Sequence, residues 1–135
     1  MTEKTYRGSC HCKAITYEVK LDLAKGTGKC NCTFCSKSRN WGAFVKPADF
    51  TLLSGKDQLA SYAGRNPTGH QYFCKTCGVR THGDGVVEEI GGAYVSVQVA
   101  TLDDVDAKNL LEGQVRFANG RDNDWMNTPA FTAHL

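Results

Sequence analysis

Phe73-Cys74-Lys75-Thr76-Cys77-Gly78 contains a Cys-x-x-Cys pair, a spacing at which one backbone turn presents two thiolates to a single metal ion. The glycine after the second cysteine favours that turn, which often needs a residue with positive φ. Two thiolates are half of a four-ligand site. The matching half lies near the start of the chain, in Gly8-Ser9-Cys10-His11-Cys12. We therefore predict a closed structural site that ties two distant segments together through Cys10, Cys12, Cys74 and Cys77.

The remaining cysteines form one compact group, Cys30-Asn31-Cys32-Thr33-Phe34-Cys35, so a single tight loop can present three thiolates to one ion. Seven cysteines cannot all pair within one chain, and cysteines that only fill a core would not need these spacings. Zinc sites with four protein ligands are structural, whereas sites with three keep one position for water or substrate. The sequence therefore predicts two zinc ions per chain, with the function at Cys30, Cys32 and Cys35.

The rest of the chain has the pattern of a small, mainly β domain. Its 135 residues are 41% hydrophobic and 22% charged, which is typical of one soluble globular domain covering residues 1–135. Alternation of apolar and polar residues predicts strands at 15–21 and 93–100, and shorter runs predict further strands at 42–46, 50–53, 71–73, 79–82 and 115–118. Helix should be limited to one or two turns within 102–111 and a short turn through 36–38.

The charge balance argues against some classes of partner. With 16 basic and 14 acidic residues the formal net charge is +2, too small to favour binding to nucleic acid or to an anionic membrane. No uninterrupted apolar run has the length of a spanning helix or of a signal peptide. We therefore expect a cytoplasmic protein, in a compartment that keeps its cysteines reduced.

The cysteine motifs in this order resemble those of the glutathione-dependent formaldehyde-activating enzyme family, the CENP-V/GFA domain with the Mss4-like fold. Beyond the motifs quoted above, the similarity includes Trp41-Gly42-Ala43-Phe44, Thr101-Leu102-Asp103-Asp104 and Phe117-Ala118-Asn119-Gly120. The resemblance implies antiparallel sheets with zinc knuckles and little helix. It also implies a structural zinc on the four-cysteine set and a substrate-handling zinc on the three-cysteine set.

The family's reaction is a carbon-sulfur lyase reaction of the S-(hydroxymethyl)glutathione synthase type, so the expected partners are a small thiol such as glutathione and a small aldehyde such as formaldehyde. Lys29, Lys37 and Arg39 flank the three-cysteine loop with charge suited to carboxylates, and Trp41 could form a wall of the site. The alternative is that the three cations are ordinary surface residues and that Trp41 belongs to the core.

Three further alternatives remain open from the sequence. His82 could complete the three-cysteine centre as a fourth ligand, which would close the site. The chain could be a thiol carrier without catalysis, or a structural zinc module for protein binding. The sequence leaves the oligomeric state undetermined.

Overall fold

The computed structural model describes residues 3–64 and 68–135, which form two β-sheets and one short α-helix. The smaller sheet has the strand order β1-β2-β5 and is antiparallel throughout. Its strands are β1 (Lys4–Ser9), β2 (Thr16–Leu21) and β5 (Phe50–Ser54). The single α-helix, α1, spans Thr33–Ser38.

The larger sheet has the strand order β10-β3-β4-β9-β8-β7-β6. Its pairs are antiparallel except that β10 runs parallel to β3. In sheet order the strands are β10 (Val115–Ala118), β3 (Thr27–Cys30), β4 (Gly42–Val45), β9 (Gly92–Gln98), β8 (Arg80–Val87), β7 (His70–Cys74) and β6 (Leu59–Tyr62).

Short 3₁₀ helices connect many of these strands. They span Leu23–Lys25, Pro47–Asp49, Lys56–Gln58, Glu88–Ile90, Val99–Thr101, Ala107–Leu111 and Gly120–Asp122. In the described part of the chain no helix is both long and apolar enough to cross a membrane.

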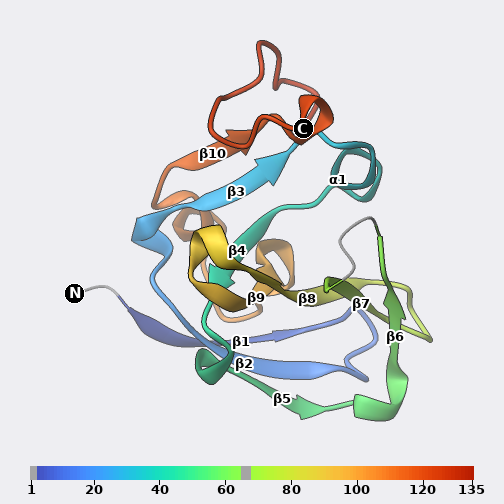
Figure 1. The fold of residues 1–135 in the computed structure, drawn as a ribbon. Coiled ribbons are helices and arrows are strands. Elements are labelled where there is room, and N and C mark those ends of the chain that lie inside the picture. Colours follow the sequence, from blue (N-terminus) through green and yellow to red (C-terminus); the bar gives the residue numbers. More distant parts are fainter. Residues whose placement is uncertain (1–2, 65–67) are drawn as a thin grey trace.

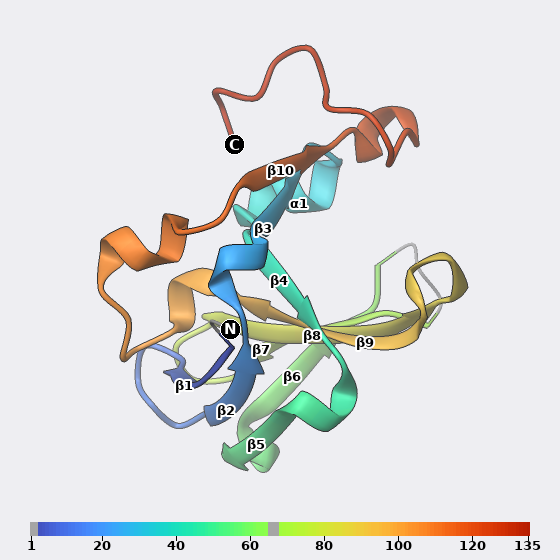
Figure 2. The same ribbon diagram turned by 90° about the vertical axis from the view of Figure 1, so that its left-hand side faces the viewer.

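The two sheets give the molecule a lower and an upper part (Figure 1). The small sheet lies below β7, β8 and β9, while β3, β10, α1 and the C-terminal tail form the upper part. Figure 2 shows β4 rising steeply from the level of β9 to β3, so the large sheet is strongly twisted. This twist separates the two halves of the large sheet and leaves room between them.

The main core lies between the small sheet and the large one. Tyr17, Val19 and Val97 are fully buried in it, and the Tyr17 hydroxyl and the Thr101 Oγ1 are 2.7 Å apart in a buried hydrogen bond. Burial of each such side chain contributes about 1.5–3 kcal/mol. A second, smaller cluster surrounds Cys10, Ile15 and Cys74. The core near these cysteines is thus small, and other interactions must hold this end of the fold.

The mainly β fold is confirmed, and every predicted strand overlaps an observed one. The alternation predicted for 15–21 is correct, since Ile15, Tyr17, Val19 and Leu21 are buried while Lys20 between them is exposed. The sequence did not predict β1, β3 or β6. β3 contains Gly28 and Lys29 and has no apolar alternation, so only its pairing with neighbours makes it a strand.

Helix within 102–111 is confined to the 3₁₀ turn Ala107–Leu111. Leu102 is buried, and the two acidic residues that follow it, Asp103 and Asp104, bind β1. Ser9 Oγ donates to Asp103 Oδ2 at 2.6 Å, and the backbone N–H of Arg7 donates to Asp104 Oδ1 at 3.2 Å. These side chains satisfy strand donors, which favours an extended chain at this point. The short turn predicted at 36–38 is the second half of α1.

Candidate metal centres

Four cysteines from two separate segments of the chain converge at one site. Cys10 and Cys12 lie in the β1–β2 connection, Cys74 is the last residue of β7, and Cys77 lies in the β7–β8 connection. Their four sulfur atoms all lie within 4.8 Å of one another, and Cys12 Sγ is 3.6 Å from Cys74 Sγ. This arrangement could hold a metal ion, and it joins the two segments that the sequence predicted to meet.

Backbone amides point at the sulfur atoms of this centre. The N–H of Ile15 donates to Cys10 Sγ at 3.3 Å, and the N–H of Thr76 donates to Cys74 Sγ at 3.3 Å. Gly78 has a φ of 78°, the positive value that the sequence predicted for the turn. Amides of Cys12 and Val79 lower the pKa of the Cys77 thiol to about 6. The local backbone therefore favours the thiolate form, which is the form that binds metals.

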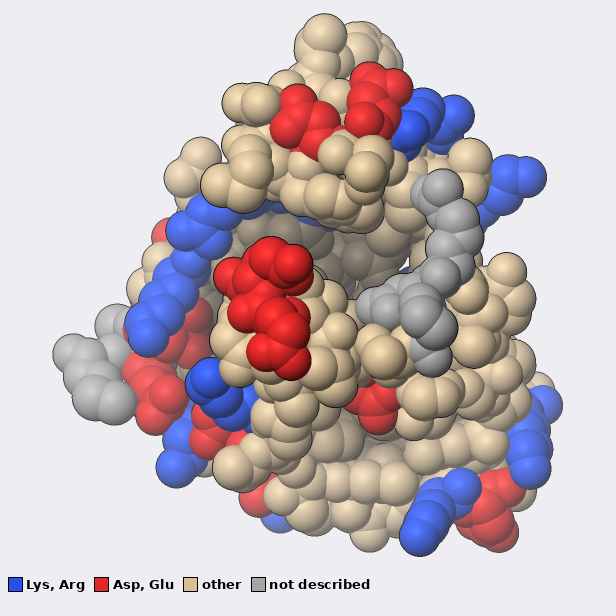
Figure 3. All heavy atoms as spheres, viewed as in Figure 1, with Lys and Arg blue, Asp and Glu red and all other residues tan. Residues whose placement is uncertain are grey.

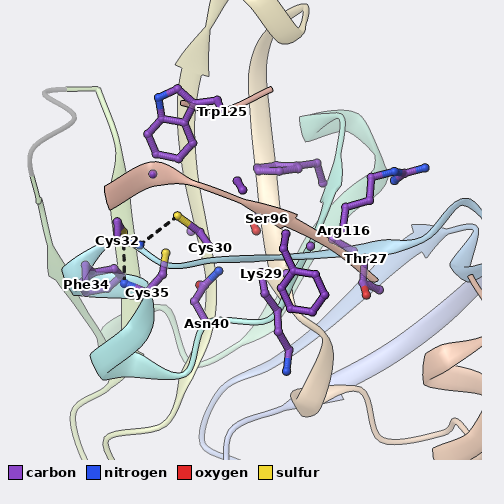
Figure 4. A pocket seen from close by; sticks show the side chains of 18 of the residues that line it. Thr27, Lys29, Cys30, Cys32, Phe34, Cys35, Asn40, Ser96, Arg116 and Trp125 are labelled. Atoms are coloured by element: carbon purple, nitrogen blue, oxygen red, sulfur yellow. Dashed lines mark hydrogen bonds between the residues drawn. The ribbon is translucent and has the colours of Figure 1, made fainter. Parts of the chain in front are cut away.

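The second cluster lies where β3 ends and α1 begins. Cys30 is the last residue of β3, Cys32 is the N-cap of α1, and Cys35 is in its first turn. The backbone N–H of Cys35 donates to Cys32 Sγ at 3.3 Å, and that of Cys32 donates to Cys30 Sγ at 3.4 Å. All three sulfur atoms lie within 4.8 Å of one another, so this loop alone could hold a metal ion (Figure 4).

The pKa values of Cys30 and Cys35 are shifted in opposite directions. A hydrogen bond from Cys35 lowers the pKa of Cys30 to about 5, with further help from the Cys32 and Gly120 amides against the opposing effect of burial. The same hydrogen bond and burial raise the pKa of Cys35. Without a cation, three adjacent thiolates repel one another, so one anion forms first. A bound cation would favour ionisation of all three.

Gly120, in the segment after β10, packs against the three-cysteine cluster. A Cβ atom at this position would lie 2.6 Å from Cys30 Sγ, closer than two such atoms can approach. Asn31 Nδ2 donates to Asn119 Oδ1 at 2.9 Å, and the N–H of Arg121 donates to Asn31 Oδ1 at 3.0 Å. These contacts fix the segment after β10 against the cysteine loop. The Asn119-Gly120 pair is the signal in the sequence that could have indicated this contact.

A cavity of about 1470 Å³ opens beside the three-cysteine cluster. Figure 3 shows the hollow between the upper and lower parts of the molecule. Its walls come from all seven strands of the large sheet, from α1 and from the C-terminal tail, and Cys30, Cys32 and Cys35 all contribute to them. Trp125 covers one side of the cavity above the sulfur atoms (Figure 4). The four-cysteine centre contributes no residue to this cavity.

The residues predicted to bind substrate lie largely outside this cavity. Lys37 is exposed and lines neither of the cavities beside the cysteine loop. Arg39 donates from Nη1 to the backbone oxygen of His134 at 2.6 Å. Trp41 packs against the main core and donates from Nε1 to Thr27 Oγ1 at 2.7 Å. Arg39 and Trp41 do line, together with Cys35, a smaller cavity of about 100 Å³ on the other side of the loop.

Four basic residues line the large cavity, and of these the sequence predicted only Lys29. They are Lys25, Lys29, Arg116 and Arg121. Lys29 Nζ lies 5.5 Å from the centre of the Trp41 ring. Arg116 belongs to the predicted strand 115–118, but the sequence does not show that this strand pairs with β3. The parallel pairing is what brings Arg116 beside β3, the strand that ends at Cys30.

His82 does not join the three-cysteine cluster among the described residues. Its ring is buried between Phe50 and Tyr72, with ring centres 4.6 and 4.9 Å away, and its Nδ1 lies 2.9 Å from Thr81 Oγ1. The alternative of a closed site completed by His82 therefore lacks support. His11, between Cys10 and Cys12, is exposed and is not part of the four-sulfur group.

Arg80 holds α1 against the large sheet. From β8 its guanidinium donates to Ser38 Oγ at 3.2 Å and to Gln71 Oε1, and it lies 4.8 Å from the centre of the Phe34 ring. We expect Arg80→Met to lower the free energy of unfolding by about 1–3 kcal/mol, because hydrogen bonds from a charged group are lost. Hydrogen exchange should accelerate in residues 33–38, and urea unfolding gives the free energy.

Arg7→Met is the matched control for Arg80→Met. Arg7 is exposed and forms only a 3.8 Å ion pair with Glu18 through its side chain, so its loss should change stability by less than about 1 kcal/mol. Equal effects of the two substitutions would contradict the role assigned to Arg80.

A mainly β domain with two all-cysteine clusters, one of four sulfurs and one of three beside a cavity, defines a class of small cysteine-rich domains that could hold metal ions. Comparison with known sequences specifies this class further. The chain belongs to the glutathione-dependent formaldehyde-activating enzyme family, whose sequence profile matches residues 5–118.

Two relatives illustrate the match. A Halomonas elongata protein named "Putative glutathione-dependent formaldehyde-activating enzyme" is 27% identical over 78 residues, which are 52% of this chain and 50% of that protein. The match thus spans only half the length of this curated relative. A crystal structure of a Rhodobacter sphaeroides protein aligns with a TM-score of 0.70 and 30% identity, over 83% of this chain and 99% of that one.

Proposed function

We propose that this chain is a zinc-dependent enzyme of the carbon-sulfur lyase type that binds a small, glutathione-like thiol at Cys30, Cys32 and Cys35. The thiol then adds reversibly to a small aldehyde such as formaldehyde. The observation that carries the proposal is the three-sulfur cluster on the wall of the large cavity, one ligand short of a tetrahedron. Family membership supports the identity of the thiol and of the aldehyde.

The donor atoms fit zinc at both centres. Each cluster offers only sulfur within 4.8 Å, and thiolate ligands favour soft or borderline ions such as zinc over magnesium or calcium. We propose a structural zinc at Cys10, Cys12, Cys74 and Cys77, and a second zinc at the other three cysteines. Seven free thiols also require a reducing compartment, so we propose a cytoplasmic protein formed by one domain.

The reaction joins two neutral molecules without a redox step. Cys30, Cys32 and Cys35 would hold the zinc ion, which would supply a soft Lewis acid that favours the thiolate form of the substrate sulfur, and the thiolate is the nucleophilic form. The new bond joins that sulfur to the carbonyl carbon, the carbon-oxygen π bond breaks, and the oxygen takes up a proton to replace the one that the thiol lost. The product is a hemithioacetal, and the reverse step releases the aldehyde.

The chain's own residues provide the surroundings for this step. The amides of Cys32 and Cys35 hold the sulfur ligands in place, and the contact of Gly120 with Cys30 Sγ keeps the segment after β10 close to the cluster. The aromatic rings of Phe34 and Trp125 line the cavity near the cysteines and limit the access of water. Orientation of the thiol beside the aldehyde then accounts for the expected rate enhancement.

The test is the rate of hemithioacetal formation from glutathione and formaldehyde, measured with zinc-loaded protein, without protein, and with Cys32→Ser. We expect Cys32→Ser to lower the zinc content from two ions to one per chain and to reduce the rate enhancement by at least about 100-fold. Lys56→Ser, on an exposed 3₁₀ helix outside the cavity, is the control that should keep both.

Three results distinguish the alternatives. Thiol binding without any rate enhancement would show a carrier. One tightly held zinc with three titratable thiols would contradict the open site and leave a structural zinc module. Two zinc ions, of which a chelator removes one while the fold survives, are the expected result.

A further inference from the structure

The large cavity carries a strong charge bias at one end. Among the described residues that line it, four are Lys or Arg and none is Asp or Glu, although the chain contains 14 acidic residues. Figure 3 shows basic side chains along one margin of the hollow. The acidic patch in front lies over the 3₁₀ helix Glu88–Ile90, which does not line the cavity. The bias indicates a ligand with a negative charge inside the cavity.

The cavity floor next to the cysteines has almost no side chains. Gly28 pairs with Gly42 on one side and with Arg116 on the other, and all three line the cavity. A Cβ on Gly28 would have no atom closer than 3.9 Å, so a larger residue there would occupy the cavity. A Cβ on Gly42 would lie 2.7 Å from Ser96 Oγ. The floor is therefore an open trough that leads from Cys30 along β3.

The basic end of this trough lies well away from the sulfur atoms. Arg116 Nη1 lies beside Gly26, where it would be 3.2 Å from a Cβ atom. Gly26 precedes Cys30 by four residues of extended chain, a separation of roughly 13 Å. Figure 4 shows the same order, with the cysteines at one end, Ser96 in the middle and Arg116 at the far end.

Two basic residues at the basic end of the trough have no structural role within the described part of the chain. Within the described residues Arg116 makes no hydrogen bond or ion pair that would hold its guanidinium, and Lys25 is exposed at the end of a 3₁₀ helix beside it. By contrast, Arg121 is held by Asn31 and Lys29 lies over Trp41. Arg116 and Lys25 are thus available to bind an anion.

The middle of the cavity is apolar. Phe44 is 63% exposed and contacts the Tyr94 ring edge-on at a centroid distance of 5.1 Å, and both residues line the cavity. An uncharged linker could lie against this pair between the two ends. The carboxylates of a small tripeptide thiol lie only roughly 7 to 9 Å from its sulfur, which is shorter than the trough.

We propose that Arg116 and Lys25 form an anion subsite that selects an elongated thiol, with a phosphate or carboxylate roughly 13 Å from its sulfur. The inference rests on the proposed function, because it needs the thiol sulfur at Cys30, Cys32 and Cys35. It goes further by defining the class of thiol: an uncharged chain along the glycine floor and an anion at the far end.

The test compares pantetheine with 4′-phosphopantetheine, which differ only in a phosphate at the end away from the thiol. Calorimetric titration of the zinc-loaded protein should show at least about 10-fold tighter binding of the phosphorylated thiol. Arg116→Gln should abolish this advantage, whereas Lys56→Gln, outside the cavity, should keep it. The advantage should also decrease as salt is raised.

A third ligand tests whether the subsite prefers a phosphate or a carboxylate. Pantetheine hemisuccinate replaces the phosphate with a carboxylate, and a preference for one of the two anions identifies the chemistry of the subsite. Equal affinity for pantetheine and both anionic forms, or an advantage that survives Arg116→Gln, would overturn the subsite while leaving the proposed function intact. Failure of glutathione and of every pantetheine form to bind would instead overturn the proposed function.

Discussion

Replacing Cys74 with serine is expected to unfold the domain even in excess zinc. Cys74 is completely buried, its sulfur accepts hydrogen bonds from the amides of Thr76 and Cys77, and it lies 3.6 Å from Cys12 Sγ across the junction of the two sheets. Structural zinc sites contribute on the order of 10 kcal/mol, which is as large as the whole stability of a typical domain. The hydrophobic cluster around Cys74 is too small to compensate.

Circular dichroism and the dispersion of amide signals in NMR spectra measure this loss of fold. Cys32→Ser is the matched control: it removes the same atom type from the other cluster, on a loop at the edge of the upper part, and should lose one zinc while the sheets persist. If Cys74→Ser stays folded with one zinc fewer, the architectural role of the four-cysteine centre is wrong.

The two cysteine groups could be predicted from the sequence because the cysteines of each motif are near one another in the chain and all candidate ligands are of one residue type. Cys30, Cys32 and Cys35 needed no tertiary information, since one loop holds all three. The four-cysteine group needed only the pairing of two half sites. Strands such as 15–21 were predictable because one face is buried and the other is not.

The large cavity could not be predicted in this way. Its basic end depends on the parallel pairing of β10 with β3, and no local pattern reveals which strand will lie beside which. The chain neighbours of the cysteine loop, Lys29, Lys37 and Arg39, were the natural candidates from spacing alone. Of these, Lys29 lines the cavity, whereas Lys37 and Arg39 lie on α1 and its C-cap outside it, and Arg116 reaches the cavity from a distant segment. The lining of the cavity thus depends on tertiary structure to a greater degree than the cysteine clusters do.

The position of the tail beyond β10 could not be predicted from the sequence either. The tail contains the aromatic residues Trp125 and Phe131, and Trp125 lines the cavity. However, Trp125 and Phe131 remain more than half exposed, so the tail is held mainly by contacts such as that of Gly120 with Cys30. Its position against the cysteine loop depends on how the surfaces of the tail and of the loop fit together, and the sequence does not reveal this fit.

Acidification should destabilise the protein through His82, by about 3 kcal/mol between pH 6.5 and pH 4. Burial lowers the pKa of His82 to about 4, against a weaker opposing effect of Asp84. Because the folded pKa lies below the unfolded value of 6.5, the unfolded chain binds more protons in this interval. Stability is therefore complete above pH 6.5 and decreases as the pH falls toward 4. The ring is enclosed by Phe50, Tyr72 and Tyr17, which offer the imidazolium no compensating anion.

His82→Phe tests this, because phenylalanine keeps the aromatic packing and cannot be protonated. The free energy of unfolding, measured by urea at each pH, should fall less steeply in the variant than in the wild type between pH 6.5 and 4. Loss of zinc at low pH affects both proteins, so the difference between the two curves isolates His82. His82→Phe also removes Nδ1, the hydrogen-bond partner of the Thr81 hydroxyl. Thr81→Val is the control for this loss. It should lower the free energy of unfolding without changing how that free energy depends on pH. Parallel curves for wild type and His82→Phe would show that His82 is not the titrating group, and the acid sensitivity would then belong to the metal-binding thiolates.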